Sequence, residues 1–257
     1  MIAVYQQYRP DRRLAPLVEC GWARSAPASG FIRVIPDGCV DLFVSSRGQA
    51  MIAGPATGFY DLHTHGDGVL AGLRLRPGAA AAVFGRPVSE FTDHVVPLAA
   101  VFGAGSGRMA EKVSTATTPG QLVAALQQMV LEYLADSEPF VDTVVIGAIG
   151  MLQRRPHWPV ASVAAAVDLS ERQLRRRFET AVGYGPKRLG RILRLQHLLE
   201  LIHACDDRVR WSELAIEARY ADQPHMINEC RELAGMSPVA LPGGVSVSSN
   251  TAAGDTS

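Results

Sequence analysis

The chain has 257 residues, 47% of them hydrophobic, which is enough to fill one large core or two ordinary ones. Its 25 Lys and Arg residues balance 25 Asp and Glu residues, so the net charge by itself indicates neither nucleic acid nor a membrane as the partner. The N-terminus lacks the apolar core of a secretion signal, and no apolar stretch reaches the roughly 20 residues that span a bilayer. We therefore expect a cytoplasmic protein with no membrane partner.

The four cysteines are Cys20, Cys39, Cys205 and Cys230. Their wide separation excludes the close pairs that structural zinc sites and dense disulfide frameworks use. We expect reduced thiols, and Cys39, Cys205 and Cys230 are interpreted as small buried hydrophobic residues.

The first 90 or so residues are predicted to form short strands broken by Gly and Pro. Phe31–Ile35 and Cys39–Ser45 predict a hairpin, because Pro36-Asp37-Gly38 between them suits a tight turn. Further strands are predicted at Met51–Gly54 and Val69–Arg76, and a helix at Ala79–Phe84.

A helical period begins at Pro119, where apolar residues recur every three or four positions: Leu122, Leu126, Met129, Val130, Tyr133 and Leu134. This stripe either covers the sheet or pairs with a second copy of itself in a homodimer. Polar residues and Pro139 follow, so we predict a sensor or dimerisation domain over residues 1–136 and a second, all-α domain over 137–241. Residues 242–257 are rich in Ser, Gly, Ala and Thr and are predicted to be a disordered tail. The predicted fold class is α+β.

The second domain contains an internal repeat of a short helix, a tight connection and a second helix. In the first unit, about residues 160–182, Ser170 suits an N-cap, and Leu174, Phe178 and Ala181 share one face of the second helix. The opposite face carries Arg172 and Arg176, with Arg175 beside them. A helix with arginines on one face and apolar residues on the opposite face is suited to a DNA major groove. Arginine binds guanine edges bidentately and also attracts phosphate.

The same layout returns in the second unit, about residues 211–234. Leu214, Ala215 and Ala218 form the inner face of its first helix, and Gln223–Leu233 form its second helix. Each unit ends in a glycine followed by a proline, which is typical of a helix stop. The amphipathic segment Lys187–Cys205 lies between the units and is predicted to be the long helix that sets their distance.

These motifs resemble the AraC/XylS family of transcriptional regulators. The resemblance rests on LSERQLRRRF, the Gly-Tyr-Gly-Pro exit and YADQPHMINECRELAGMSP, while IPDGCVDL and GLRLRPGAAAAVFG resemble a sensor-type domain fused to such regulators. It implies two helix-turn-helix units that read successive major-groove segments of double-stranded DNA. The base-reading positions would be Arg172, Arg175 and Arg176 in the first unit and Gln223, Pro224, Ile227 and Asn228 in the second. The full set of predicted DNA contacts is Ser170, Arg172, Gln173, Arg175, Arg176, Arg177, Lys187, Arg188, Gln223, His225, Asn228 and Arg231.

The second unit departs from the family pattern. The family has a glycine where Arg219 stands and an arginine where Asn228 stands. Residues 172–194 hold eight basic residues and one acidic residue, whereas residues 205–234 hold four basic and seven acidic ones. Because affinity for DNA follows the phosphates that basic side chains neutralise, we expect the first unit to dominate binding.

Other readings remain open at this point. Arg74 and Arg76 share a strand face and suit an anionic effector, although ion-paired or solvated arginines are more common. His63 and His65 would suit a metal on a strand, but surface histidines in a loop are the favoured interpretation. For His225, a surface role and a contact with DNA are equally favoured interpretations.

Two alternatives compete with a DNA-binding regulator. Cys20 or Cys39 would act as a nucleophile in an enzyme, but the clustered cysteines and the Pro-Cys-His run of methyl-accepting regulators are absent from the sequence, so no enzyme activity and no cofactor are predicted. A ligand-binding or dimerisation protein with a decayed DNA-binding half is the second alternative. RNA polymerase is a further expected partner if the protein is an activator, and a small-molecule effector would act by shifting how the recognition helices are presented.

Overall fold

The computed structural model describes residues 5–25, 29–46, 48–65, 68–103, 115–116, 118–135, 139–205 and 210–241. The strands are β1 (Tyr5–Tyr8), β2 (Val18–Ser25), β3 (Ser29–Val34), β4 (Val40–Ser45), β5 (Ala50–Ala53), β6 (Tyr60–His65), β7 (Val69–Leu75) and β8 (Val95–Pro97). They are followed or interrupted by the helices α1 (Ala80–Phe84), η1 (Val88–Phe91), α2 (Ala99–Phe102), α4 (Pro119–Ala135), α5 (Thr143–Arg154), α6 (Val160–Ala166), α7 (Glu171–Val182), α8 (Pro186–Ala204), α9 (Trp211–Glu217), α10 (Gln223–Ala234) and η2 (Pro238–Ala240). The predicted α+β class is confirmed.

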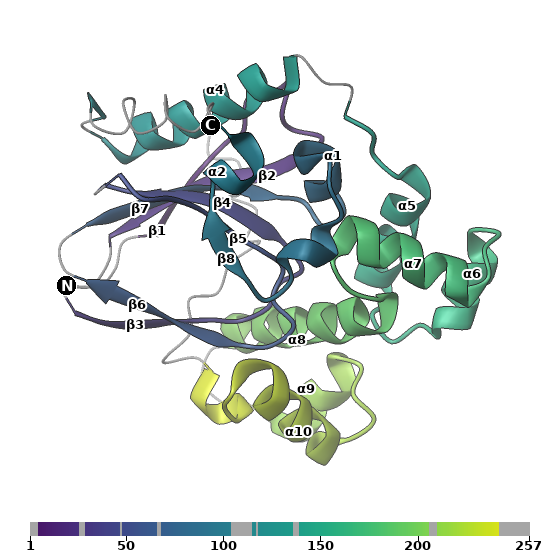
Figure 1. Cartoon of the computed structure of the whole chain (residues 1–257). Coiled ribbons are helices and arrows are strands. Elements are labelled where there is room, and N and C mark those ends of the chain that lie inside the picture. The colour runs from purple at the N-terminus through teal and green to yellow at the C-terminus, as the bar shows by residue number, and fades with distance from the viewer. Residues whose placement is uncertain are drawn as a thin grey trace, which may run out of the picture.

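The N-terminal half contains two antiparallel sheets. Six strands pair in the order β1-β2-β7-β4-β5-β8, and β3 pairs with β6 in a separate two-stranded sheet. Side chains on β4 alternate between the two faces of the large sheet, because successive residues of a strand point to opposite sides. Leu42 and Val44 are fully buried on the face that α4 covers, whereas Asp41 and Phe43 line a cavity on the other face. Figure 1 shows α4 on one side of this sheet and β3–β6 on the other.

The predicted hairpin between Phe31–Ile35 and Cys39–Ser45 is wrong, although both segments contribute strands. β3 pairs with β6, with Val34 opposite Tyr60, whereas β4 pairs with β5 and β7. The turn between them carries the chain from one sheet to the other. Gly38 supplies the left-handed backbone there with φ +86°, and the Asp37 carboxylate accepts a hydrogen bond from the Cys39 amide at 2.9 Å. The strands at Met51–Gly54 and Val69–Arg76 and the helix at Ala79–Phe84 are confirmed within a residue or two.

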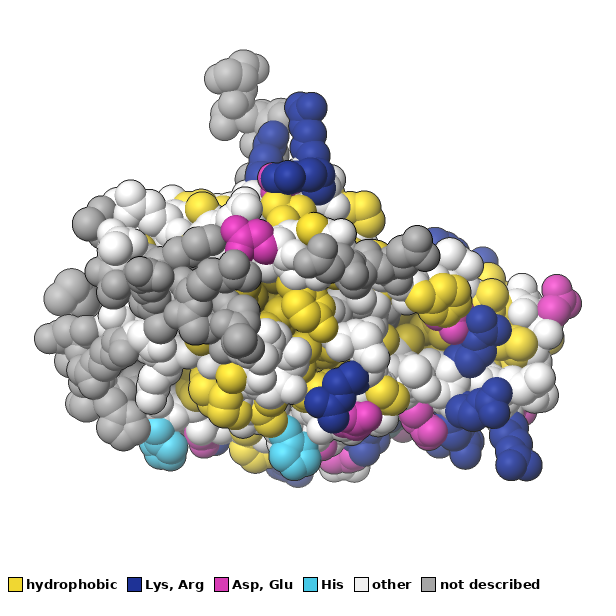
Figure 2. All heavy atoms as spheres, turned by 45° about the horizontal axis from the view of Figure 1, so that its top comes forward, with side chains coloured by type: hydrophobic (Ala, Val, Ile, Leu, Met, Phe, Trp, Pro, Cys, Tyr) yellow, Lys and Arg dark blue, Asp and Glu magenta, His cyan; other side chains and the backbone are white. Residues whose placement is uncertain are grey.

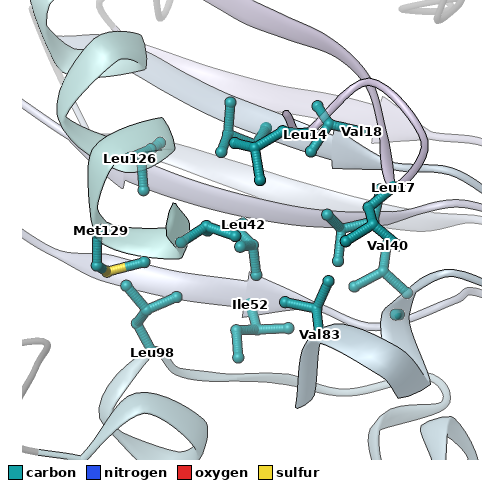
Figure 3. Close-up of a cluster of buried hydrophobic side chains, with 14 of the residues drawn as sticks. Leu14, Leu17, Val18, Val40, Leu42, Ile52, Val83, Leu98, Leu126 and Met129 are labelled. Atoms are coloured by element: carbon teal, nitrogen blue, oxygen red, sulfur yellow. The ribbon is translucent and has the colours of Figure 1, made fainter. Parts of the chain in front are cut away.

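The apolar stripe of α4 covers the large sheet of its own chain. Leu122, Leu126, Met129 and Val130 are at most 5% exposed, and Figure 3 shows Leu126 and Met129 pointing toward Leu42 and Leu98. A dimer through this stripe is therefore contradicted, since its side chains already have an intramolecular partner surface. The predicted domain boundary at residues 136–137 and the predicted tail at 242–257 lie outside the described residues.

The C-terminal half is built on α8, which belongs to two hydrophobic clusters. Leu189 and Ile192 in its first half pack with α5, α6 and α7, whereas Leu195, Leu198 and Leu199 pack with α9 and α10. One rigid helix therefore links both helix pairs, as Figure 1 shows, and the predicted linker helix is confirmed. Among the described helices, none has the length and apolar character needed to cross a membrane.

Candidate nucleic-acid interface

The first helix pair has the predicted helix-turn-helix geometry. Asp168 takes the left-handed conformation in the turn, with φ +54°, and the Leu169 amide donates to the Ala164 carbonyl at 3.0 Å. Ser170 caps α7: its hydroxyl accepts from the Gln173 amide at 3.3 Å, while the Gln173 side chain accepts from the Ser170 amide at 2.9 Å. This reciprocal capping box fixes where α7 begins. The Ser170 and Gln173 side chains therefore both form the cap, and a contact of either with DNA would be made in addition to it.

The outward face of α7 carries three exposed arginines: Arg172, Arg175 and Arg176. Leu174 and Phe178 are fully buried behind them. Within the described part of the chain, no carboxylate forms an ion pair with any of the three arginines. In Figure 2 one group of Lys and Arg side chains lies at the end of the molecule where α5, α6 and α7 lie in Figure 1, and another projects from the top of the view. Their guanidinium groups are free to meet phosphates or base edges.

Arg177 has a different role from the one predicted. Its guanidinium donates to both carboxylate oxygens of Asp142, with Nε at 2.7 Å and the terminal nitrogen at 2.9 Å. Asp142 also caps α5 by accepting from the amides of Val144 and Val145. The pair ties α7 to the start of α5, so the structure argues against Arg177 as a DNA contact. A bidentate ion pair holds the Arg177 guanidinium more strongly than a single surface hydrogen bond would.

The second helix pair repeats the backbone of the first. The Tyr220 amide donates to the Ala215 carbonyl at 2.8 Å, Arg219 takes the left-handed conformation with φ +66°, and Asp222 caps α10 by accepting from the His225 amide. The family's glycine at the position of Arg219 is thereby explained, because this turn requires a positive φ. Arg219 adopts the same backbone at some cost in strain.

Three arginines of α8, Arg188, Arg191 and Arg194, form ion pairs with acidic residues of α10. Glu229, the buried charged residue of α10 at 4% exposure, accepts from Arg191 Nε at 2.7 Å and from Arg194 at 2.7 and 2.9 Å. Glu232 accepts from Arg191 at 2.5 and 2.8 Å and from Arg188 at 3.3 Å. These contacts join residues 35 to 44 positions apart. The network holds the second unit against the helix that links it to the first.

This network corrects the interpretation drawn from counting charges along the sequence. Arg188 was predicted to contact DNA, but its guanidinium also donates to the Thr57 carbonyl at 3.4 Å, which points it toward the N-terminal half. Four of the eight basic residues between 172 and 194 are in ion pairs, namely Arg177, Arg188, Arg191 and Arg194. Arg177 pairs with Asp142, and the other three pair with Glu229 and Glu232, two of the seven acidic residues between 205 and 234. The charge contrast between the units is therefore smaller at the surface than in the sequence.

The outward face of α10 is polar and sparsely charged. Gln223, Asn228 and Arg231 are exposed, as the sequence predicts for contacts with DNA. His225 is more enclosed: its Nδ1 accepts from the Ala221 amide at 3.3 Å, and its ring meets the edge of the Tyr220 ring at 5.4 Å between centroids. One side of the His225 ring is therefore used in contacts that stabilise the turn. Lys187, at the start of α8, is exposed.

Comparison with family models matches residues 163–241 to a helix-turn-helix domain, a span that includes both helix pairs and α8. These residues form a helix-turn-helix domain of the AraC type. Residues 6–97 match a domain of unknown function, DUF6597, which spans both sheets of the N-terminal half. No curated protein matches the chain.

Solved structures with a similar course of the chain include ToxT from Vibrio cholerae. One ToxT structure has a TM-score of 0.47 and 7% identity, covering 91% of this chain and 96% of that one. A second ToxT structure, described as bound to an unsaturated fatty acid, has a TM-score of 0.41 and 9% identity, with 92% of each chain covered. The AraC-like transcriptional activator CuxR has a TM-score of 0.21 and 14% identity over 72% of this chain and 73% of that chain.

The N-terminal half of the regulator contacts both recognition units. The Thr92 hydroxyl donates to the Gly183 carbonyl at the exit of α7 at 3.0 Å. The Phe59 ring lies so close to Gly235, at the exit of α10, that a Cβ there would approach it to 2.5 Å. α8 is also held, because the Gln196 side chain donates to the Pro36 carbonyl at 2.8 Å. The orientation of both units is therefore coupled to the N-terminal fold.

A cavity lies between the two sheets of the N-terminal half, with Trp22, Phe43, Tyr60, Asp37, Asp41 and Arg74 among the residues that line it. Arg74 was predicted as an anion receiver, but its guanidinium contacts Asp41 at 2.9 Å and Asp37 at 3.3 Å. The ion-paired alternative is therefore correct for Arg74. Arg76 lies past the end of β7, where it is exposed and donates to the Ala15 carbonyl, and it does not line this cavity.

The thiols and histidines weighed from the sequence have ordinary structural surroundings. Burial raises the pKa of the Cys20 thiol to about 11 and also raises the pKa of Cys39, so both thiols are protonated near neutral pH and are poor nucleophiles. Cys39 and Cys230 are buried as predicted, whereas Cys205 is only partly buried. His63 and His65 lie on strand β6 and not in a loop. Among the described residues, no three His, Cys, Asp or Glu side chains gather closely enough to hold a metal ion.

Proposed function

We propose that this regulator recognises a specific operator in double-stranded DNA mainly through α7. The proposal rests on a difference between two sets of arginines. Arg172, Arg175 and Arg176 on α7 are exposed and form no ion pairs among the described residues. The arginines of α8, in contrast, form ion pairs with Glu229 and Glu232. A bidentate contact from arginine to guanine contributes about 1–3 kcal/mol of discrimination between bases. Lys187 adds a positive charge close to the exit of α7.

The second unit serves as a weaker reader at a fixed distance from the first. Its fold is complete: Leu214, Met226, Cys230 and Leu233 are buried in one cluster with α8. This intact core supports a working DNA-binding unit and gives no support to a decayed one. Gln223 and Asn228 are suited to adenine edges, and Arg231 is suited to phosphate.

The proposed organisation follows from these roles. Residues 1–136 form the sensor domain, residues 137–241 form the DNA-binding domain, and residues 242–257 form a tail. The protein works in the cytoplasm without catalysis. It contacts RNA polymerase if it activates transcription, and a homodimer would form through a surface other than the α4 stripe.

A small effector in the N-terminal cavity controls the units. Asp37 lines the cavity and belongs to the same turn as Gly38, where a Cβ would come within 3.0 Å of the Leu189 side chain at the start of α8. The neighbouring Pro36 carbonyl accepts from Gln196. A ligand that moves Asp37 therefore moves a turn that α8 rests on, and it shifts the two units together.

The test begins with capture of genomic DNA fragments on the full-length protein, followed by sequencing. A reproducible short motif is expected, and the absence of any enriched motif would overturn the proposal. Gel-shift titration on the recovered motif then compares Arg172→Ala and Arg176→Ala with Asn228→Ala. We expect each arginine substitution to weaken binding by about tenfold to a hundredfold and Asn228→Ala to have a smaller effect. Equal losses would contradict the dominance of α7.

A further inference from the structure

The segment that joins α5 to α6 has a fixed backbone and carries exposed basic side chains. The Arg155 amide donates to the Met151 carbonyl at 2.9 Å at the end of α5, and the Trp158 amide donates to the Arg155 carbonyl at 3.0 Å in the turn that follows. The Pro156 carbonyl lies against α8, where a Cβ at Gly190 would approach it to 2.6 Å. These contacts hold the segment directly before α6, the first helix of the first helix-turn-helix unit.

The positive charge of this segment has no neighbouring counter-charge along the chain. Arg154 and Arg155 are exposed, and so is His157. No Asp or Glu occurs in the sequence between Asp142 and Asp168, and Asp142 is already in an ion pair with α7. Across the described ranges, neither Arg154 nor Arg155 forms an ion pair with a carboxylate. Both guanidinium groups are therefore available to an anion from outside the chain.

Arg155 is held in place by an aromatic ring. Its guanidinium carbon lies 5.2 Å from the centroid of the Trp158 ring, within the range of a cation–π contact. Trp158 packs in turn against the hydrophobic cluster that contains Leu174 and Phe178 of α7. A cation–π contact uses no N–H group, so the donors of Arg155 stay available for hydrogen bonds. A restrained arginine of this kind loses less side-chain freedom when it binds an anion.

The place of the segment in the helix-turn-helix unit indicates which anion it meets. In such units the second helix lies in the major groove of DNA, while the first helix crosses the backbone. Here α7 is the second helix and α6 is the first, and Figure 1 shows both at one end of the molecule with α5. Ser162, exposed in the first turn of α6, adds a hydroxyl donor close to the segment. Guanidinium groups and hydroxyls are the donors that bind phosphate oxygens.

We propose that Arg154 and Arg155 bind the phosphate backbone of DNA beside the groove that α7 enters. This inference rests on the function proposed above and adds two contacts outside the base-reading positions. Because every sequence has the same phosphates, the two arginines contribute affinity and orientation but no choice of sequence. Their loss therefore weakens binding to the operator and to an unrelated duplex by a similar factor.

The test measures fluorescence anisotropy of the full-length protein on two duplexes, the operator and a random sequence, over a series of salt concentrations. We expect Arg154→Gln and Arg155→Gln each to reduce the slope of log K against log salt concentration by up to about 0.9, and the double variant by up to about 1.8, on both duplexes. The ratio of the two affinities should stay within about twofold of the wild type. An unchanged slope in the double variant would overturn the proposal, and so would a loss confined to the operator.

Two further variants separate a local contact from an effect of total charge. Arg155→Lys keeps the charge and should retain the slope. Arg12→Gln is the matched control, because it removes an exposed arginine from the N-terminal half, and it should leave the slope unchanged. A reduction as large for Arg12→Gln as for Arg155→Gln would refute the assignment. Thermal melting checks that each variant is folded.

The two proposals fail independently, because the random duplex requires no operator. A reduced slope on the random duplex, with no motif recovered from genomic DNA, would contradict the proposed reading by α7 alone. Operator binding that depends on Arg172 but is indifferent to Arg154 and Arg155 would contradict the present inference alone.

Discussion

The network between α8 and α10 predicts a large effect of one conservative substitution, Glu229→Gln. The glutamine has the same shape but no charge, and it faces Arg191 and Arg194 at a site that is 4% exposed. Removing one partner of a buried ion pair costs about 3–5 kcal/mol, because the remaining charge is left without compensation. Arg191 keeps Glu232 as a partner, so we expect the lower end, about 3 kcal/mol.

Urea unfolding followed by tryptophan fluorescence measures this loss, since Trp211 packs beside the cluster that contains the network. Glu232→Gln is the matched control: it removes the same kind of charge from α10, but its side chain is 53% exposed. Exposed ion pairs contribute about 0–1 kcal/mol. If the two variants lose equal stability, the network does not hold the second unit in place and the reasoning is refuted.

Three further predictions concern single positions. Arg219→Gly should stabilise the protein by about 1 kcal/mol, because glycine adopts φ +66° without strain, and Arg219→Ala should give no such gain in the same urea assay. Cys20 should react slowly with iodoacetamide at neutral pH and faster as the pH rises toward its pKa of about 11, since only the thiolate reacts; mass spectrometry showing Cys20 labelled faster than Cys205 at neutral pH would contradict this. Gly72→Ala should displace the Trp22 ring, lower stability by about 1–3 kcal/mol and shift the fluorescence emission, and an unchanged spectrum and stability would count against the close packing of Trp22 over Gly72.

The helix-turn-helix units could be predicted from the sequence because their signals are short in range. The Ser170-Gln173 capping box, the buried spacing of Leu174 and Phe178, and the helix stops at Gly183 and Gly235 each lie within one or two helical turns. Such local patterns determine a helix and its ends without reference to distant parts of the chain.

Strand partners and ion pairs could not be predicted in the same way. The alternation in Val40–Ser45 predicts a strand, but it does not indicate that β4 pairs with β7 in place of β3. Glu229 was missed because it binds arginines 35 and 38 residues away, so counting charge along the chain treated paired groups as free ones. A signal was present in the sequence: Glu229 and Cys230 follow Met226 at helical spacing, which places a carboxylate near a buried face.

The division of arginines into DNA-facing and structural ones is tested most directly by the salt dependence of operator binding. Fluorescence anisotropy gives the slope of log K against log salt concentration for the wild type, Arg176→Gln and Arg194→Gln. Each phosphate contact contributes about 0.9 to this slope. We expect Arg176→Gln to reduce the slope by up to that amount and Arg194→Gln to leave it unchanged. A reduced slope for Arg194→Gln, with none for Arg176→Gln, would contradict the account.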